Sequence, residues 1–141
     1  RTASKADPLY RQLLDSDPND ADLLTAAGEN MIREQKWSQA VEIFQQSLNL
    51  HPDQGDAWSG LAFAASENQE YPLVLTALDH RAQYLSDGPA TLFLRATALD
   101  HLHHTREAIS YYRKFLSEAQ GKFPDEESQT RRRLAELRKS H

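Results

Sequence analysis

Apolar residues recur along the chain at spacings of three and four, which is the pattern of helices that bury one face. Two neighbouring stripes of this kind are separated by the polar stretch 34–36. Because so short a stretch can only be a helix–helix turn, the two predicted helices must pack antiparallel. The first stripe comprises Leu24, Ala27, Gly28 and Met31, and the second comprises Ala40, Phe44 and Leu48.

The stripes repeat, because a shift of 34 residues aligns the chain with itself through three units. One aligned position holds only small residues, which lets paired backbones approach closely, while large apolar side chains fill the space beside them. The pattern predicts three interlocked helical hairpins. The aligned sets are Leu24, Trp58 and Leu92; Gly28, Ala62 and Ala96; Met31, Ala65 and Leu99; Ala40, Val74 and Ala108; and Phe44, Leu78 and Tyr112.

Turn and N-cap residues mark the joints between units at 17–20, 51–53 and 86–89. Read backwards by one period, Tyr10 takes the position of Phe44. The segment 6–17 is therefore predicted to be the second helix of a repeat whose first helix is missing.

A last helix is predicted over residues 125–138, because its first residues are acidic and its last are basic, which suits the helix dipole. Leu134 and Leu137 give it one narrow apolar stripe. We expect this helix to cover the exposed side of the last hairpin, as repeat arrays require.

The order of large, small, apolar, Ala, aromatic and Pro positions in residues 21–54 resembles the tetratricopeptide repeat, and residues 55–88 and 89–122 follow it. The resemblance implies an all-α fold, a right-handed superhelix of antiparallel helical hairpins in one structural domain. Residues 1–20 would then supply the second helix of a truncated repeat, and residues 123–141 a capping helix.

By the same resemblance, the first helix of each unit lines a concave groove and shows one face to a partner protein or peptide. Phe63 and Phe93 can anchor an apolar side chain of that partner, and the alternative is that they pad neighbouring helices. Family members that clamp the C-terminal carboxylate of chaperone peptides use Lys, Arg and Asn on these faces, and their absence argues against such a clamp. The expected groove residues are Thr25, Glu29, Ile32, Ser59, Phe63, Ser66, Phe93, Thr97 and Asp100.

Two arginines, Arg81 and Arg95, occupy positions that the family usually fills with small or apolar residues. A buried guanidinium must find a partner or extend its stem to water. Asp79 and Asp100 are candidate partners. Two interpretations remain open, a structural ion pair or an anion-reading pair in the groove.

The net charge of -5 conceals an asymmetry along the chain. Residues 1–127 carry 11 basic and 20 acidic side chains, whereas residues 128–141 carry 5 basic and 1 acidic. An acidic body repels phosphate, so we do not expect a nucleic-acid partner. The run 131–133 of three arginines is either a patch for an acidic partner or phosphate, or a solvated helix face.

The sequence offers little catalytic chemistry, since it has no cysteine, no nucleophile motif and no Gly-rich phosphate loop. His101, His103 and His104 are the only cluster of metal-ligand residues, with His80 on the preceding predicted helix. A zinc site needs three or four converging ligands, and two of these histidines fall in a predicted turn. We therefore expect no metal, no cofactor and no enzyme activity.

The function that the sequence favours is a protein-binding scaffold. Self-association through exposed repeat ends, giving a homo-oligomer, is the second hypothesis, and a metal-dependent enzyme is the third. No apolar run approaches the roughly 20 residues of a membrane span, so direct membrane insertion is not expected. The first residues lack a signal peptide and an initiator Met. We expect a soluble fragment of a longer, exported or membrane-anchored protein, in a compartment that the sequence does not identify.

Overall fold

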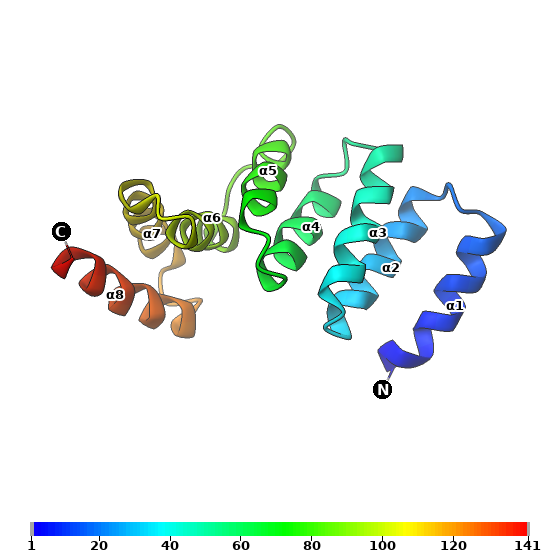
Figure 1. Ribbon diagram of the computed structural model, residues 1–141, viewed down its shortest axis with the longest axis horizontal. Helices are drawn as coiled ribbons and strands as arrows, with labels where there is room; N and C mark the ends of the chain where they lie inside the picture. The colour runs from blue at the N-terminus through cyan, green and yellow to red at the C-terminus, as the bar shows by residue number, and fades with distance from the viewer. Residues whose placement is uncertain (1, 141) are drawn as a thin grey trace. The chain divides into compact units, whose positions relative to one another are not determined.

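The computed structural model describes residues 2–140, with side chains from Pro8 to Ser140, and this part of the chain contains helices and no strand. It forms two compact units, one ending at Leu85 and the other beginning at Ser86. Unit 1 holds α1 to α5 and unit 2 holds α6 to α8 (Figure 1). The helices are α1 (Thr2–Ser16), α2 (Ala21–Arg33), α3 (Trp37–Leu50), α4 (Gly55–Glu67), α5 (Tyr71–Arg81), α6 (Pro89–His101), α7 (Thr105–Ala119) and α8 (Pro124–Lys139).

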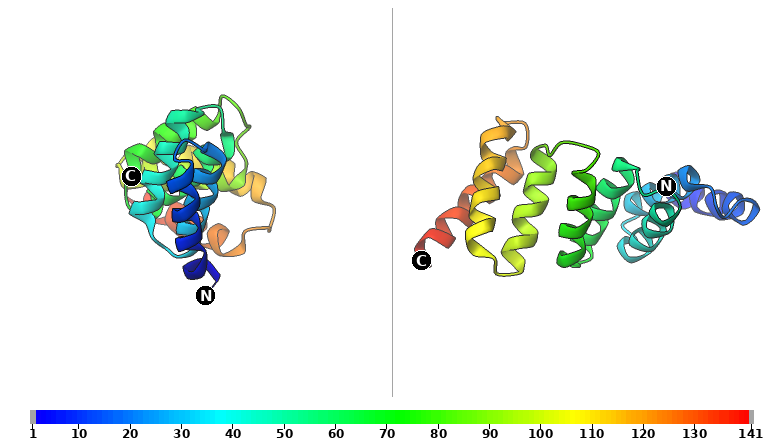
Figure 2. Two further views of the ribbon diagram at one scale, coloured as in Figure 1. Left: turned by 90° about the vertical axis from the view of Figure 1, so that its right-hand side faces the viewer. Right: turned by 90° about the horizontal axis from the view of Figure 1, so that it is seen from above.

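Consecutive helices form antiparallel hairpins, α2–α3 and α4–α5 in unit 1 and α6–α7 in unit 2 (Figure 2). The first helices of these hairpins begin at Ala21, Gly55 and Pro89, which keeps the 34-residue period of the sequence. In addition, α1 packs on α2 and α8 packs on α7. The predicted all-α fold of antiparallel helical hairpins is confirmed.

The three hairpin turns share one backbone conformation. A residue in the left-handed region follows each first helix, with φ of 60° at Gln35, 60° at Gln69 and 63° at His103. The next N–H then donates back across the turn, as from Lys36 to the carbonyl of Met31 at 2.9 Å. This Schellman arrangement satisfies carbonyls that the helix end leaves open. The equivalent bonds run from Glu70 to Ala65 at 2.8 Å and from His104 to Leu99 at 2.9 Å.

Phe44 is the centre of packing in unit 1. Its ring is fully buried and lies against two glycines, Gly28 on α2 and Gly60 on α4. A Cβ added at Gly28 would come within 2.8 Å of the ring, and one at Gly60 would overlap it. The absence of side chains at both positions therefore lets α2 and α4 close on α3 through a single aromatic ring.

Most of the aligned apolar positions of unit 1 are buried as predicted, including Leu24, Val74 and Leu78. Trp58 differs, because it is only half-buried. Its ring stacks on His80 with 4.4 Å between centroids, and its Nε1–H donates to the carbonyl of Pro52 at 2.7 Å. An indole suits this position at the edge of the core, because its ring contacts apolar side chains while its N–H group reaches a polar partner near solvent.

The first helix, α1, docks through part of its predicted apolar set. Tyr10 and Leu14 are half-buried and face Ala27 and Met31 of α2 across a small cleft. Leu13 was expected to dock with them and instead is exposed, as is Leu9. A second apolar face of α1 is therefore left open to solvent.

Unit 2 has its own core, in which Phe115 of α7 is fully buried among Leu92 and Ala119. The predicted burial of Arg95 is confirmed. Its guanidinium pairs with Asp87, Nε to Oδ2 at 3.3 Å, and lies over the ring of Tyr111. Arg95 thus pairs with a different carboxylate from the two that the sequence suggested, and it has a structural partner.

The predicted capping helix is α8, with Leu137 buried and Leu134 half-buried. Its start is fixed by Glu127, whose buried carboxylate accepts hydrogen bonds from the N–H groups of Gly121 and Phe123, at 3.1 and 2.9 Å. An ionised acceptor for two backbone donors makes strong bonds and orders the loop that enters the helix.

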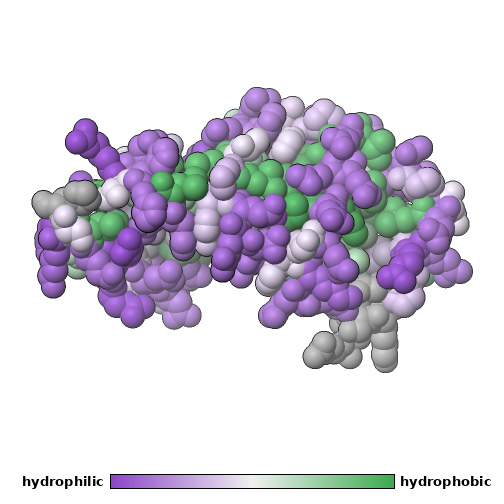
Figure 3. Space-filling model, viewed as in Figure 1, coloured by the Kyte–Doolittle hydropathy of each residue, from purple (hydrophilic) through white to green (hydrophobic). Residues whose placement is uncertain are grey.

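Hydrophilic side chains cover most of the face shown in Figure 3, with apolar side chains emerging as separate patches between them. Among the described residues, no helix is both long enough and apolar enough to cross a membrane.

The contact between Phe44 and Gly60 predicts an unusual response to alanine. Gly60→Ala should gain up to about 1 kcal/mol in helix propensity and lose about 1–3 kcal/mol to overpacking, so the free energy of unfolding should fall. In a Phe44→Leu background, where the ring is gone, the same change should cost less. Chemical denaturation of the four proteins of this cycle measures the coupling, and purely additive effects would contradict the packing.

The turn geometry predicts that glycine stabilises the second hairpin. At Gln69 a φ of 60° costs an L-residue on the order of 1 kcal/mol, and glycine avoids that cost. Gln69→Gly should therefore raise the free energy of unfolding by about 0.5–1 kcal/mol. The matched change Gln45→Gly, on the exposed side of α3, should lower it by about 1 kcal/mol. A loss of stability in both variants would be inconsistent with the turn.

Candidate functional site

Unit 1 brings together the first-helix faces that the resemblance predicts as a groove wall, since α2 and α4 are in direct contact. Of the residues expected there, Glu29 and Phe63 are exposed. Ile32, Ser59 and Ser66 are half-exposed. These five side chains form what we call the α2/α4 face.

Thr25, which was expected on the same face, is buried. Its hydroxyl lies 2.8 Å from the hydroxyl of Ser47 on α3 and 3.2 Å from Gln54 Oε1, and its single proton serves one of these acceptors at a time. Ser47 in turn donates to the carbonyl of Ala21 at 2.8 Å. Thr25 therefore belongs to a polar network that ties α2 to α3 and to the start of α4.

Phe63 is the largest apolar group on the α2/α4 face, with 39 % of its surface exposed. Its ring meets Trp37, at the start of α3, edge to face with centroids 5.9 Å apart. Its neighbours in sequence, Ala62 and Ala64, are fully buried and complete the packing of α4 without it. The pair is thus a rigid aromatic surface that the fold holds in place but does not cover.

Ser59 contacts Arg81, the second arginine at a position that the family usually fills with a small or apolar residue. The Nε–H of Arg81, on α5, donates to Ser59 Oγ at 2.6 Å, so this guanidinium reaches the edge of the α2/α4 face. Ser59 is thus one partner of this guanidinium.

In unit 2 the expected groove residues are used differently. Phe93 packs on the buried ring of Phe115, with centroids 5.1 Å apart, and is partly buried against the core of the unit. Its environment matches the padding alternative. Thr97 is half-buried, and its hydroxyl donates to the carbonyl of Leu94 at 3.1 Å.

A cleft of about 570 Å³ lies between α6, α7 and α8, lined in part by Thr97 and Asp100. Opposite them stand Arg132, Arg133 and Glu136 of α8. Both signs of charge are present, so the cleft is polar without a clear preference for an anion or a cation.

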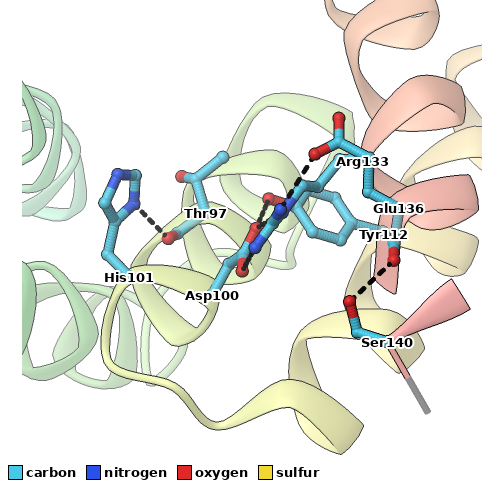
Figure 4. A network of polar contacts seen from close by, with 7 residues as sticks. All are labelled: Thr97, Asp100, His101, Tyr112, Arg133, Glu136 and Ser140. Atoms are coloured by element: carbon cyan, nitrogen blue, oxygen red, sulfur yellow. Dashed lines mark hydrogen bonds and ion pairs between the residues drawn. The ribbon is translucent and has the colours of Figure 1, made fainter. Parts of the chain in front are cut away.

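A bidentate ion pair forms one wall of this cleft (Figure 4). Arg133 donates from Nε to Asp100 Oδ2 at 2.7 Å and from Nη2 to Oδ1 at 2.8 Å. Tyr112 of α7 donates its hydroxyl to Oδ2 at 2.8 Å. The carboxylate therefore links three helices, and two parallel bonds fix the orientation of the guanidinium.

The protonation of this network is well defined. Burial raises the pKa of Asp100. The hydrogen bonds from Arg133 and Tyr112 and the charge of Arg133 lower it by more than burial raises it, so the pKa lies below its usual 3.8. Burial, then the bond to Asp100 and its charge, raises the pKa of Tyr112 above its usual 10.0. At neutral pH Asp100 is ionised and accepts three hydrogen bonds, which suits it to holding α8 and makes it a poor base.

The histidines have separate local partners. His101 Nδ1 lies 2.8 Å from the carbonyl of Thr97, and His104 Nδ1 lies 3.5 Å from Glu107. Within residues 2–140, no three His, Cys, Asp or Glu side chains gather as metal ligands would. The expected lack of a metal or cofactor stays a prediction.

The sequence analysis missed the Asp100–Arg133 pair, although it singled out both residues. The first helices start at Gly55 and Pro89, and α8 starts at Pro124, one residue beyond the next step of the period. Extending the 34-residue register to the end segment would have placed α8 beside α6 and so suggested a contact between their polar faces.

Comparison with known proteins gives a family match and several structural neighbours. A tetratricopeptide-repeat family model matches residues 2–62, and no curated protein matches the sequence. The crystal structure of MamA protein is 18% identical and has a TM-score of 0.80, covering 98% of this chain and 80% of that one. MamA 41-end from Desulfovibrio magneticus RS-1 is 16% identical, with a TM-score of 0.77 and coverage of 99% and 87%.

A third neighbour is YrrB, described as a TPR protein with an unusual peptide-binding site. It is 11% identical, with a TM-score of 0.72, and the alignment covers 91% of this chain and 63% of that one. Such low identities show a shared fold and no more. The family match therefore identifies a tetratricopeptide-repeat segment over residues 2–62, and the 34-residue register of helices and turns continues the same pattern through α7.

Proposed function

We propose that this protein is a scaffold without catalytic activity that binds a partner polypeptide on the α2/α4 face of unit 1. The observation that carries the proposal is the exposed ring of Phe63, held edge-on by Trp37 at 5.9 Å. Aromatic side chains that are already ordered lose little entropy on binding and are frequent hot spots. Stacked helical repeats commonly use such surfaces for recognition.

The surroundings of Phe63 favour a peptide as the ligand. Ser66 offers a hydroxyl group one turn after Phe63 on α4, and Glu29 adds a negative charge. Hydroxyls can pair with a peptide backbone while the ring receives one apolar side chain. The peptide-binding site named in the description of YrrB is consistent with this use of the fold.

Self-association is the second candidate, and the open face of α1 favours it. Leu9 and Leu13 lie one helical turn apart and expose 55 % and 44 % of their surfaces. Two such leucines are a small patch that a second copy could cover. Light scattering separates the two candidates. A monomeric mass at high concentration would exclude self-association, whereas the proposal of peptide binding on the α2/α4 face would still stand.

Peptide binding is testable with a displayed library of peptides of about a dozen residues, selected on the whole chain. Phe63→Ala should weaken the selected peptides by about 1–3 kcal/mol and leave thermal stability unchanged, because the ring is not part of the core. Leu50→Ala is the matched control, since Leu50 is equally exposed, at 38 % against 39 %. Failure to select any peptide, or equal affinity in the Phe63→Ala variant, would refute the proposal.

A second prediction concerns Asp100, which the proposal assigns to holding α8 and not to the ligand. Asp100→Asn should lower the stability of unit 2 by about 1–2 kcal/mol, a modest value because Arg133 is 40 % exposed. Since the folded pKa lies below 3.8, the difference from wild type should be constant above about pH 5 and shrink as pH falls below 3.8. Hydrogen exchange of the α8 amides measures this difference in stability between wild type and Asp100→Asn. A difference that grows as the pH falls would contradict the assignment.

A further inference from the structure

The far side of α8 carries a groove that the proposed function does not use. It lies between α7 and α8 in unit 2 and has a volume of about 510 Å³. Its floor is apolar, formed by Ile109 of α7 and by Leu134, Ala135 and Leu137 of α8. Leu137 is buried, and the other three remain half-exposed.

Three arginines complete the lining of this groove, Arg113 from α7 and Arg131 and Arg138 from α8. Neither Arg113 nor Arg138 forms an ion pair with another described residue, and all three side chains are exposed. Arg131 has only a 3.7 Å contact with Glu127, whose carboxylate already serves two backbone N–H groups. Among the described residues, none that lines this groove is acidic. The cleft between α6, α7 and α8 differs, because its lining carries both signs of charge.

The spacing of the α8 residues matches the contact stripe of a packed helix. Arg131, Leu134, Ala135 and Arg138 follow one another at positions i, i+3, i+4 and i+7, so they form one face two turns long. Ile109 and Arg113 on α7 are one turn apart and face the same groove. A third helix laid along this groove would bury its apolar stripe on the floor and bring its flanks to the arginines.

We propose that this groove binds an amphipathic helix of a partner protein that carries Asp or Glu on the flanks of its apolar stripe. The apolar floor supplies the contact area, and the guanidinium groups of Arg113 and Arg138, which form no ion pair with a described residue, select acidic flanks and reject basic ones. The arginines extend bidentate donors that match carboxylates. This second surface lies on unit 2, so it stands independently of peptide binding on the α2/α4 face.

The proposal is testable with a labelled synthetic helix of about 14 residues, four turns, with leucines at the i, i+3, i+4 and i+7 positions and glutamates beside them. Fluorescence anisotropy with the whole chain should show saturable binding that weakens as salt is raised. The same peptide with lysines in place of glutamates should not bind, and neither should a version with serines in place of the leucines.

Protein variants locate the binding. The double change Arg113→Ala with Arg138→Ala should lower affinity by about tenfold or more. The matched control, Lys114→Ala with Arg132→Ala, removes the same charge from the same two helices outside the groove and should leave affinity unchanged. Reversing the two groove charges, Arg113→Glu with Arg138→Glu, should transfer binding to the lysine peptide.

Three results would overturn the proposal: no binding of the glutamate peptide, equal loss in the control variant, or binding of both peptides alike. Vesicles that contain anionic lipids provide a further test, because a membrane surface also presents apolar groups and negative charges. Binding to these vesicles without binding to the glutamate peptide would assign the groove to lipid and reject the helix. The Phe63→Ala variant should bind the glutamate peptide normally, which separates this test from that of the α2/α4 face.

Discussion

Unit 1 depends on the fit of one phenylalanine against two glycines. Phe44 projects from α3 and contacts Gly28 on α2 and Gly60 on α4, so a single ring fixes the distance between a hairpin and the first helix of the next. Because tightly packed interiors do not yield to an added methyl group, this contact constrains three helices at once. The α2/α4 face follows from it, since the same approach of α2 and α4 sets Glu29, Ile32 and Phe63 on neighbouring helices.

The spacing of apolar residues was sufficient to predict the hairpins but not all the contacts within them. Gly28 was recognised because it shares a column with Ala62 and Ala96, whereas Gly60 lies outside every aligned column and its role depends on a ring from another helix. The turns were equally hidden. Gln35, Gln69 and His103 adopt a conformation that favours glycine, so residue type gave no signal although their positions keep the 34-residue period.

The resemblance predicts which helices would carry the site, and the groove assignment itself stays a prediction. The resemblance correctly identified which helices are first in each hairpin. It does not distinguish polar residues that serve the interior from polar residues that face solvent. Thr25 and Asp100 are polar because the interior needs hydrogen bonds there, one within a network to Ser47 and the other with Arg133 and Tyr112. Phe93 is aromatic because Phe115 needs a neighbour. Only a structure separates these internal contacts from the exposed position of Phe63, whose neighbours Ala62 and Ala64 are fully buried.

The charge asymmetry of the sequence acquires a physical meaning at α8. Its five basic residues in 131–139 divide by helix face: Arg133 is committed to Asp100, whereas Arg131 and Arg138 border the apolar groove with Arg113. A purely solvated helix face would need no apolar floor between its arginines, and a purely structural face would pair them. The arrangement satisfies neither description. The ligands proposed for the α2/α4 face and for the arginine-bordered groove would be held by different forces, since added salt weakens charge pairing and leaves apolar contact largely intact. A scaffold with both proposed sites would therefore hold two chemically distinct partners without competition for one site.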